Sequence, residues 1–91
     1  MGIRWNGQAH RDLIRVHAFL APVNPAAAAS VAEGVIEAIE HLGARPRLGS
    51  RLPEFDPREV RHLIAGDYEI RYEVSHLQLI ILRIWHVRED R

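Results

Sequence analysis

The last stretch of the chain, residues 79–91, constrains the fold more than any other. It begins as an almost unbroken apolar run, LIILRIW, and ends in a cluster of charged residues. A run this short, with a polar turn before it and a charged tail after it, is typical of a strand buried on most of both faces. We therefore expect the fold to be built against this strand. Functional residues are expected near its C-terminal end, where Trp85, His86 and Arg88 occur.

Length and composition exclude several classes of protein. A chain of 91 residues predicts one domain, residues 1–91, with one modest core. It contains no cysteine, which excludes disulfide frameworks, thiolate metal sites and cysteine nucleophiles. No apolar stretch approaches the roughly 20 residues of a membrane span, and the N-terminus lacks the apolar core of a signal peptide. These features predict a soluble, cytoplasmic protein.

The charges are balanced, with a formal net charge of zero at pH 7. All 12 basic residues are arginine, so no lysine can donate a proton or form a Schiff base. Balanced charge argues against a broad nucleic-acid-binding surface, although a local arginine patch is compatible with it.

Two amphipathic helices are predicted in the first half of the chain. Residues 8–20 carry apolar side chains at helical spacing, with Asn6 as N-cap. The polar residues of this helix that we expect in water are Gln8, Arg11, Asp12 and Arg15. The second helix begins with Asn24 as N-cap and Pro25 at the first helical position, and Gly43 is expected to end it in the left-handed conformation. The short connection predicts an antiparallel hairpin.

The second half predicts strands. Residues 44–57, with three prolines, predict a long loop. Strands are expected at 58–64, 68–75 and 79–87, joined by tight turns into an antiparallel meander, with a short edge strand at 3–5. Alternation in 68–75 places Tyr68, Ile70, Tyr72 and Val74 on one face and Glu69, Arg71 and Glu73 on the other. The predicted class is α+β, in two layers: an N-terminal helix hairpin packed on a small antiparallel sheet, in the order β-α-α-β-β-β.

Strict alternation in the last strand predicts two different faces. Ile81, Arg83, Trp85 and Val87 share one face, and Ile80, Leu82, Ile84 and His86 share the other. Because burying an unpaired arginine is costly, Arg83 and Trp85 are placed on the face that the helices leave open. Ile81 and Trp85 would then be only partly covered, and a partner protein would cover them.

Four segments together resemble the RelE/ParE superfamily of bacterial toxins from type II toxin–antitoxin modules. They are Pro46-x-x-Gly49, residues 58–61 (REVR), residues 68–74 (YEIRYEV) and residues 81–91 (ILRIWHVREDR). The most specific is Ile-Leu-x-Ile-Trp-His-x-Arg at 81–88, which is similar to the plasmid-stabilisation, ParE-like branch. The resemblance implies the same fold and a toxin neutralised by direct binding of an antitoxin encoded beside it. It also implies that an antitoxin segment wraps the toxin and adds a helix or strand to it.

The resemblance implies one of two activities. ParE-like toxins inhibit DNA gyrase, whereas RelE-like toxins cleave messenger RNA on the ribosome. The RelE pattern uses lysines and arginines on the sheet and a tyrosine near the C-terminus. Here lysine is absent, no tyrosine follows Tyr72, and Glu69 stands where RelE-like sequences commonly have arginine. These departures favour gyrase inhibition.

Two alternatives remain open. A RelE-like ribonuclease would need an acid, a base and cations, and the candidate catalytic residues are His86, Arg88, Arg71, Arg83 and His62. The other alternative is a non-toxic binding module of the same fold.

The candidate residues for binding a target or partner are Arg61, Arg71, Arg83, Trp85, His86 and Arg88. The simpler interpretation is structural: His86 bonds to backbone, and Arg71 and Arg83 pair across strands with Glu69 or Glu73. No cofactor is expected, and no metal site, because the histidines lack further ligands at suitable spacing. A homodimer and a toxin–antitoxin hetero-oligomer both remain open, since the sequence does not give stoichiometry.

Overall fold

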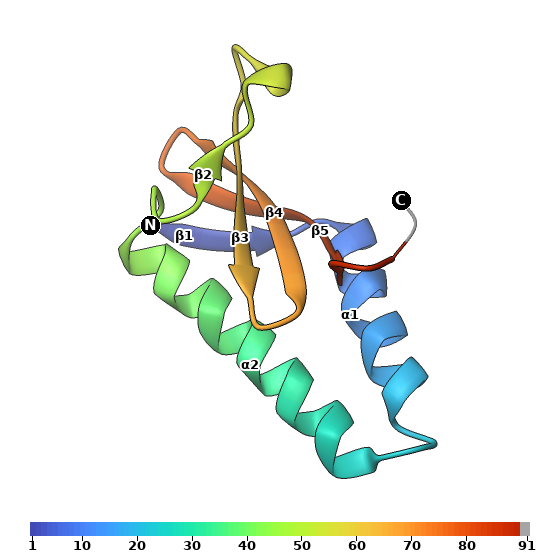
Figure 1. Ribbon diagram of the computed structural model, residues 1–91. Coiled ribbons are helices and arrows are strands. Elements are labelled where there is room, and N and C mark those ends of the chain that lie inside the picture. Colours follow the sequence, from blue (N-terminus) through green and yellow to red (C-terminus); the bar gives the residue numbers. More distant parts are fainter. Residues whose placement is uncertain (90–91) are drawn as a thin grey trace.

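The computed structural model describes residues 1–89, so that the last two residues of the C-terminal motif lie outside the described residues. The elements are β1 (Gly2–Trp5), α1 (Gly7–Leu20), α2 (Pro25–Ala44), β2 (Ser50–Arg51), the 3-10 helix η1 (Pro53–Phe55), β3 (Glu59–Ala65), β4 (Tyr68–Ser75) and β5 (Gln78–His86). The two helices form a hairpin beside a five-stranded sheet (Figure 1). The predicted α+β class is confirmed, with β2 and η1 formed inside the segment predicted as a loop.

The sheet has the strand order β1-β5-β4-β3-β2, so β5 is an interior strand, flanked by β1 and β4. β3, β4 and β5 form the predicted antiparallel meander. β1, however, runs parallel to β5, with Ile3 opposite Leu79. The sheet is therefore mixed rather than purely antiparallel. The last residue of β4, Ser75, and the first residue of β1, Gly2, both lie opposite Gln78, the first residue of β5. β5 therefore starts at the same end of the sheet as β1 and runs beside it in the same direction.

Both helices begin at the predicted caps. The Asn6 side chain accepts a hydrogen bond from the Ala9 amide at 2.8 Å, and the Asn24 side chain accepts one from the Ala27 amide at 3.1 Å. The predicted end of α2 at Gly43 is wrong, because the helix continues to Ala44. Gly43 instead permits close packing: a Cβ there would lie 3.0 Å from Cδ1 of Ile3.

The core lies between the helix hairpin and the sheet. Its buried residues include Ala9, Val35, Ile39, Leu42, Ile70, Tyr72, Leu79, Ile81 and Ile84. Val35, Ile39 and Leu42 recur at helical spacing in the second half of α2, which is why this part of the helix packs on the sheet.

Tyr72 connects the core to the loop that contains the Pro46-x-x-Gly49 motif. Its ring is fully buried, and its hydroxyl donates to the Pro46 carbonyl at 2.8 Å and accepts from the Gly49 amide at 2.9 Å. A Cβ at position 49 would lie 2.5 Å from the His62 carbonyl oxygen and 2.7 Å from the Tyr72 hydroxyl. The motif is thus an anchored turn that only glycine fits.

A β-bulge changes the faces of β5. Arg71 lies opposite Arg83 and Tyr72 lies opposite Ile81, which leaves Leu82 as an extra residue between the two pairs. The bulge breaks the alternation, so Ile81 and Ile84 are both fully buried in the core while Leu82 lies outside the core cluster. The predictions that Ile81 is partly uncovered and that Leu82 faces the helices are therefore wrong.

Candidate partner-binding groove

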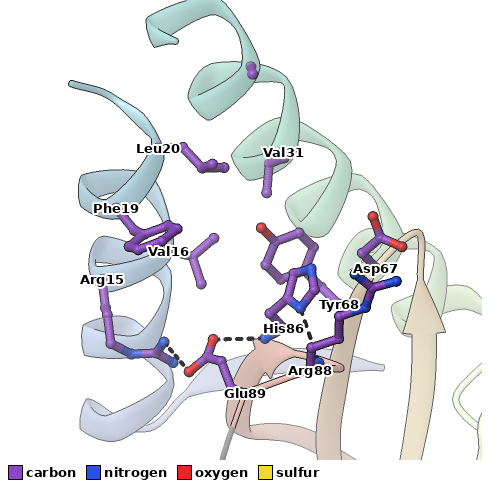
Figure 2. A pocket seen from close by; sticks show the side chains of 11 residues that line it. Arg15, Val16, Phe19, Leu20, Val31, Asp67, Tyr68, His86, Arg88 and Glu89 are labelled. Carbon is purple, nitrogen blue, oxygen red and sulfur yellow. Dashed lines mark hydrogen bonds and ion pairs between the residues drawn. The ribbon is translucent and has the colours of Figure 1, made fainter. Parts of the chain in front are cut away.

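A groove of about 630 Å³ lies between the helix hairpin and the end of β5 (Figure 2). The helices contribute Arg15, Val16, Phe19, Leu20, Ala27 and Val31, and the sheet end contributes Asp67, Tyr68, His86, Arg88 and Glu89. The wall formed by the helices is largely apolar, and the wall formed by the sheet end is polar.

The groove exists because the helix hairpin extends beyond the sheet. Figure 1 shows the two helices meeting at a tip that no strand underlies. Apolar residues toward this tip therefore lack a cover: Phe19 is 81% exposed, and Val23 in the connection is 87% exposed. Phe19 also lines the groove, so apolar surface is left in contact with water on its helix wall.

Asp12 fixes α1 against β5. The prediction that it lies in water is wrong, since it is 1% exposed. Its carboxylate accepts hydrogen bonds from the Ile84 amide at 2.9 Å and from Nε of Arg83 at 2.8 Å. Burial raises the pKa of Asp12, but the hydrogen bonds from Arg83, from the Ile84 amide and from the Gln8 side chain outweigh it and hold the pKa below its ordinary value.

Arg15 complements Asp12 on the same edge. Its guanidinium donates to the Ile84 carbonyl at 3.0 Å. β1 ends at Trp5, opposite Ile81, so no strand pairs with Ile84 on this side of β5. The side chains of Asp12 and Arg15 instead form hydrogen bonds with the amide and the carbonyl of Ile84.

Glu89 holds the C-terminal turn on α1. One of its carboxylate oxygens accepts from the His86 amide at 2.9 Å, and the other forms an ion pair with Arg15. Burial raises the pKa of Glu89, but the hydrogen bonds from Arg15 and from the His86 amide outweigh it, so the pKa lies below its ordinary value. Because Arg15 and Glu89 both line the groove, this ion pair joins its helix wall to its sheet wall.

His86 and Tyr68 form the aromatic part of the sheet wall. Their rings meet edge to face, with centroids 5.2 Å apart and planes at 89°. Nδ1 of His86 accepts a hydrogen bond from the Arg88 amide at 3.0 Å. A neutral ring in this geometry carries its proton on Nε2. His86 thus has the backbone contact that its structural interpretation predicts, and it also lines the groove.

Arg71, Arg83 and Trp85 lie on the opposite face of the sheet, which also carries His62 and Glu69; we call it the open face. The guanidinium carbons of Arg71 and Arg83 lie 4.9 Å and 5.2 Å from the centroid of the Trp85 ring. Arg71 also stacks on Phe55 of η1, at 5.2 Å. Trp85 is only 4% exposed, so the prediction that it presents uncovered apolar surface is wrong. The arginines cover it through cation–π contacts.

The charges of the open face are largely paired. Glu69 lies 3.5 Å from Nδ1 of His62 and 3.8 Å from a guanidinium nitrogen of Arg71. Arg83 pairs with Asp12 of α1 rather than across strands, while Glu73 pairs with Arg58 at 2.7 Å. Arg83 still has a side chain that is 45% exposed.

Arg61, the remaining candidate, supports a loop. It donates to the Gly49 carbonyl at 2.7 Å and to the Glu59 carboxylate at 2.8 Å. It does not line the groove.

The candidate catalytic residues do not come together. His86 and Arg88 line the groove, whereas Arg71, Arg83 and His62 lie on the open face. Neighbouring residues in a strand point to opposite faces of the sheet. Trp85 therefore faces the open face, and His86, the next residue, faces the groove. Within residues 1–89, no group of three or more His, Cys, Asp or Glu side chains could hold a metal ion. No helix in this part of the chain has the length and apolar character needed to cross a membrane.

The sequence patterns did not indicate several residues that line the groove, among them Arg15, Phe19, Val31, Tyr68 and Glu89. Phe19 flanks the apolar stripe of α1, which was a weak signal that it faces away from the core. Its exposure follows from the length of the hairpin relative to the sheet, and a periodicity argument does not give that length.

Comparison with known proteins identifies the family. A family model described as the ParE toxin of type II toxin–antitoxin system, parDE, matches residues 3–91. A solved structure described as "Chromosomal ParDE TA system from P. aeruginosa" includes a chain with 22% identity and a TM-score of 0.79, over 94% of this chain and 95% of that one. Comparison with curated protein sequences gave no match. The solved structure supports the fold, and the family match spans almost all residues: the chain belongs to the ParE toxin family of type II toxin–antitoxin systems.

Proposed function

We propose that this chain is the toxin of a type II module, that it inhibits DNA gyrase in the cytoplasm, and that an antitoxin holds it inactive by binding in the groove. The observation that carries the antitoxin part is the exposed apolar wall beside the groove, where Phe19 is 81% exposed. Family membership and the ParE-like motif at 81–88 support the gyrase part.

The shape of the groove suits an amphipathic helix. Two helices wall it on one side, and a helix can lay its apolar face between them at the usual spacing of about 8–10 Å between packed helix axes. Val16, Phe19 and Val31 would then contact the apolar face of the antitoxin helix. An apolar segment bound here would cover surface that water otherwise contacts, which favours binding.

The open face is our candidate for the gyrase contact. Arg71 and Arg83 are held by stacking on Trp85, so little side-chain entropy is lost when they bind a partner. Arginine and tryptophan are also enriched among the residues that dominate interface energies. In this assignment His86 and Arg88 contact the antitoxin, and Arg71 and Arg83 contact the target, with Trp85 and Arg61 as supports.

Two assays test the proposal. Purified toxin at increasing excess should abolish supercoiling of relaxed plasmid by gyrase. Gyrase that stays fully active at high toxin excess would contradict the proposed inhibition. Primer extension on cellular messages after induction should give no new cleavage ends. New ends that disappear in His86→Ala would instead support the ribonuclease alternative.

A further inference from the structure

The sheet wall of the groove carries hydrogen-bond donors that this chain does not use. Within residues 1–89, the Tyr68 hydroxyl, Nε2 of His86 and the Arg88 guanidinium have no hydrogen-bond acceptor. Figure 2 shows the Tyr68 hydroxyl pointing into the space between Leu20 and Val31. A donor that becomes buried by an apolar occupant costs free energy unless the occupant supplies an acceptor.

Each of these groups is fixed as a donor. Burial, together with the nearby Asp67 and Glu89 charges, raises the pKa of Tyr68, so the hydroxyl keeps its proton at neutral pH. The Arg88 amide occupies Nδ1 of His86, which leaves the ring proton on Nε2. Arg88 is a permanent cation.

The acidic groups at the same end are not equivalent. Glu89 is committed to Arg15 and to the His86 amide, so its charge is compensated. Asp67 lines the rim near Arg88, and no ion pair joins the two side chains. Arg88 is therefore available to an incoming anion, and Asp67 weakens that attraction without blocking it.

Resting on the proposed function of the groove, we infer that its sheet wall is a carboxylate subsite. It binds one Asp or Glu side chain on the apolar face of the antitoxin helix, with Tyr68, His86 and Arg88 as donors. Charged acceptors form stronger hydrogen bonds than neutral ones, and a guanidinium favours a carboxylate over an amide. One acid at a fixed place among apolar residues would set the register of the helix in the groove.

The test uses displayed peptides of about 20 residues, patterned as amphipathic helices and long enough to fold on the protein. Peptides that bind the wild-type chain are selected first. Those that no longer bind the Phe19→Glu variant are taken to occupy the groove, because Phe19 lines it. Leu77→Glu is the matched control, since it alters an apolar residue that is 77% exposed in the turn between β4 and β5, at the end of the sheet away from the groove. Groove binders should carry one Asp or Glu between apolar positions. Changing that acid to its amide should weaken binding about ten-fold, a change in the peptide alone that leaves the protein intact.

Variants of the protein, combined with the acid and amide forms of the peptide, make a double-mutant cycle. Tyr68→Phe and Arg88→Gln should weaken the acidic peptide several-fold and leave its amide form nearly unchanged, because the interaction is shared between the two partners. Asp67→Asn should strengthen the acidic peptide only. Groove binders without an acid, or acid-to-amide changes without effect, would overturn the carboxylate subsite while leaving the groove as the binding site. Absence of any binder sensitive to Phe19→Glu would overturn both.

Discussion

The amide of Ile84 on β5 donates a hydrogen bond of 2.9 Å to the carboxylate of Asp12 on α1. Asp12 itself is only 1% exposed. This bond occupies the edge of β5 where β1 has already ended, opposite Ile81. It fixes the first helix at a defined position along the sheet. Because Val16 and Phe19 follow Asp12 on the same helix, this anchor also positions the apolar wall of the groove.

Removing the Asp12 carboxylate should destabilise the fold. Asp12→Ala leaves the buried Ile84 amide without its acceptor and Arg83 without its ion pair. We expect the free energy of unfolding to fall by about 3 kcal/mol. Urea titration measures it, with Glu33→Ala on the exposed side of α2 as the control, where a change within about 0.5 kcal/mol is expected. Equal stability of the two variants would contradict the anchoring role.

Stability should depend on the protonation of Asp12. Its pKa is lower in the folded chain than its ordinary value, so the folded state binds the proton less readily than the unfolded state. The stabilisation is therefore present above about pH 4, the ordinary pKa of an aspartate, and is lost as the pH falls through the folded pKa. Urea titrations from pH 7 downward should show a shallower loss for Asp12→Asn than for the wild type. Parallel curves would mean that Asp12 does not contribute.

Two glycines should respond in opposite ways to the same change. In Gly49→Ala the new Cβ would lie 2.5 Å from the His62 carbonyl oxygen, so the turn must move and the Tyr72 hydroxyl bonds are strained. A loss of about 2 kcal/mol in the free energy of unfolding is expected. Gly34→Ala in α2 meets nothing within 4 Å and should stabilise by about 0.5–1 kcal/mol, because alanine favours a helix. Thermal and urea unfolding of both variants would check the pair.

A charge in the apolar wall should separate toxicity from neutralisation. Phe19→Glu changes a residue that is 81% exposed, so folding should be unaffected while the antitoxin helix meets a charge. Cells that express this variant with the antitoxin should stop growing, whereas cells with Leu77→Glu and the antitoxin should grow, because Leu77 is 77% exposed in the turn between β4 and β5, at the other end of the sheet. Growth measured after induction decides between these results. Rescue of both variants would place the antitoxin elsewhere on the toxin.

Local signals predicted much of the fold. The N-caps Asn6 and Asn24 begin their helices where the sequence predicts, and the alternation in β4 gives its faces correctly. The errors arise where tertiary contacts override local rules. The bulge at Leu82 shifts the faces of β5, and Gly43 packs on Ile3 instead of ending α2.

The candidate site was predicted only in part. His86 and Arg88 line the groove at the C-terminal end of β5, which is where the sequence placed the candidate residues. Their separation from Arg71 and Arg83 follows from the two faces of the strand, which divide a sequence motif that looks continuous. The burial of Asp12 could not be predicted either, because it depends on β1 being shorter than β5.

The measurement that tests the central claim most directly is gyrase supercoiling with purified wild-type toxin and two arginine variants. Wild type should abolish supercoiling at high excess, and Arg71→Ala should require about ten-fold more protein, as expected for loss of one strong interface contact. Arg45→Ala, at the exposed end of α2, should inhibit like the wild type. Unimpaired supercoiling at high excess of the folded wild-type toxin would contradict the account.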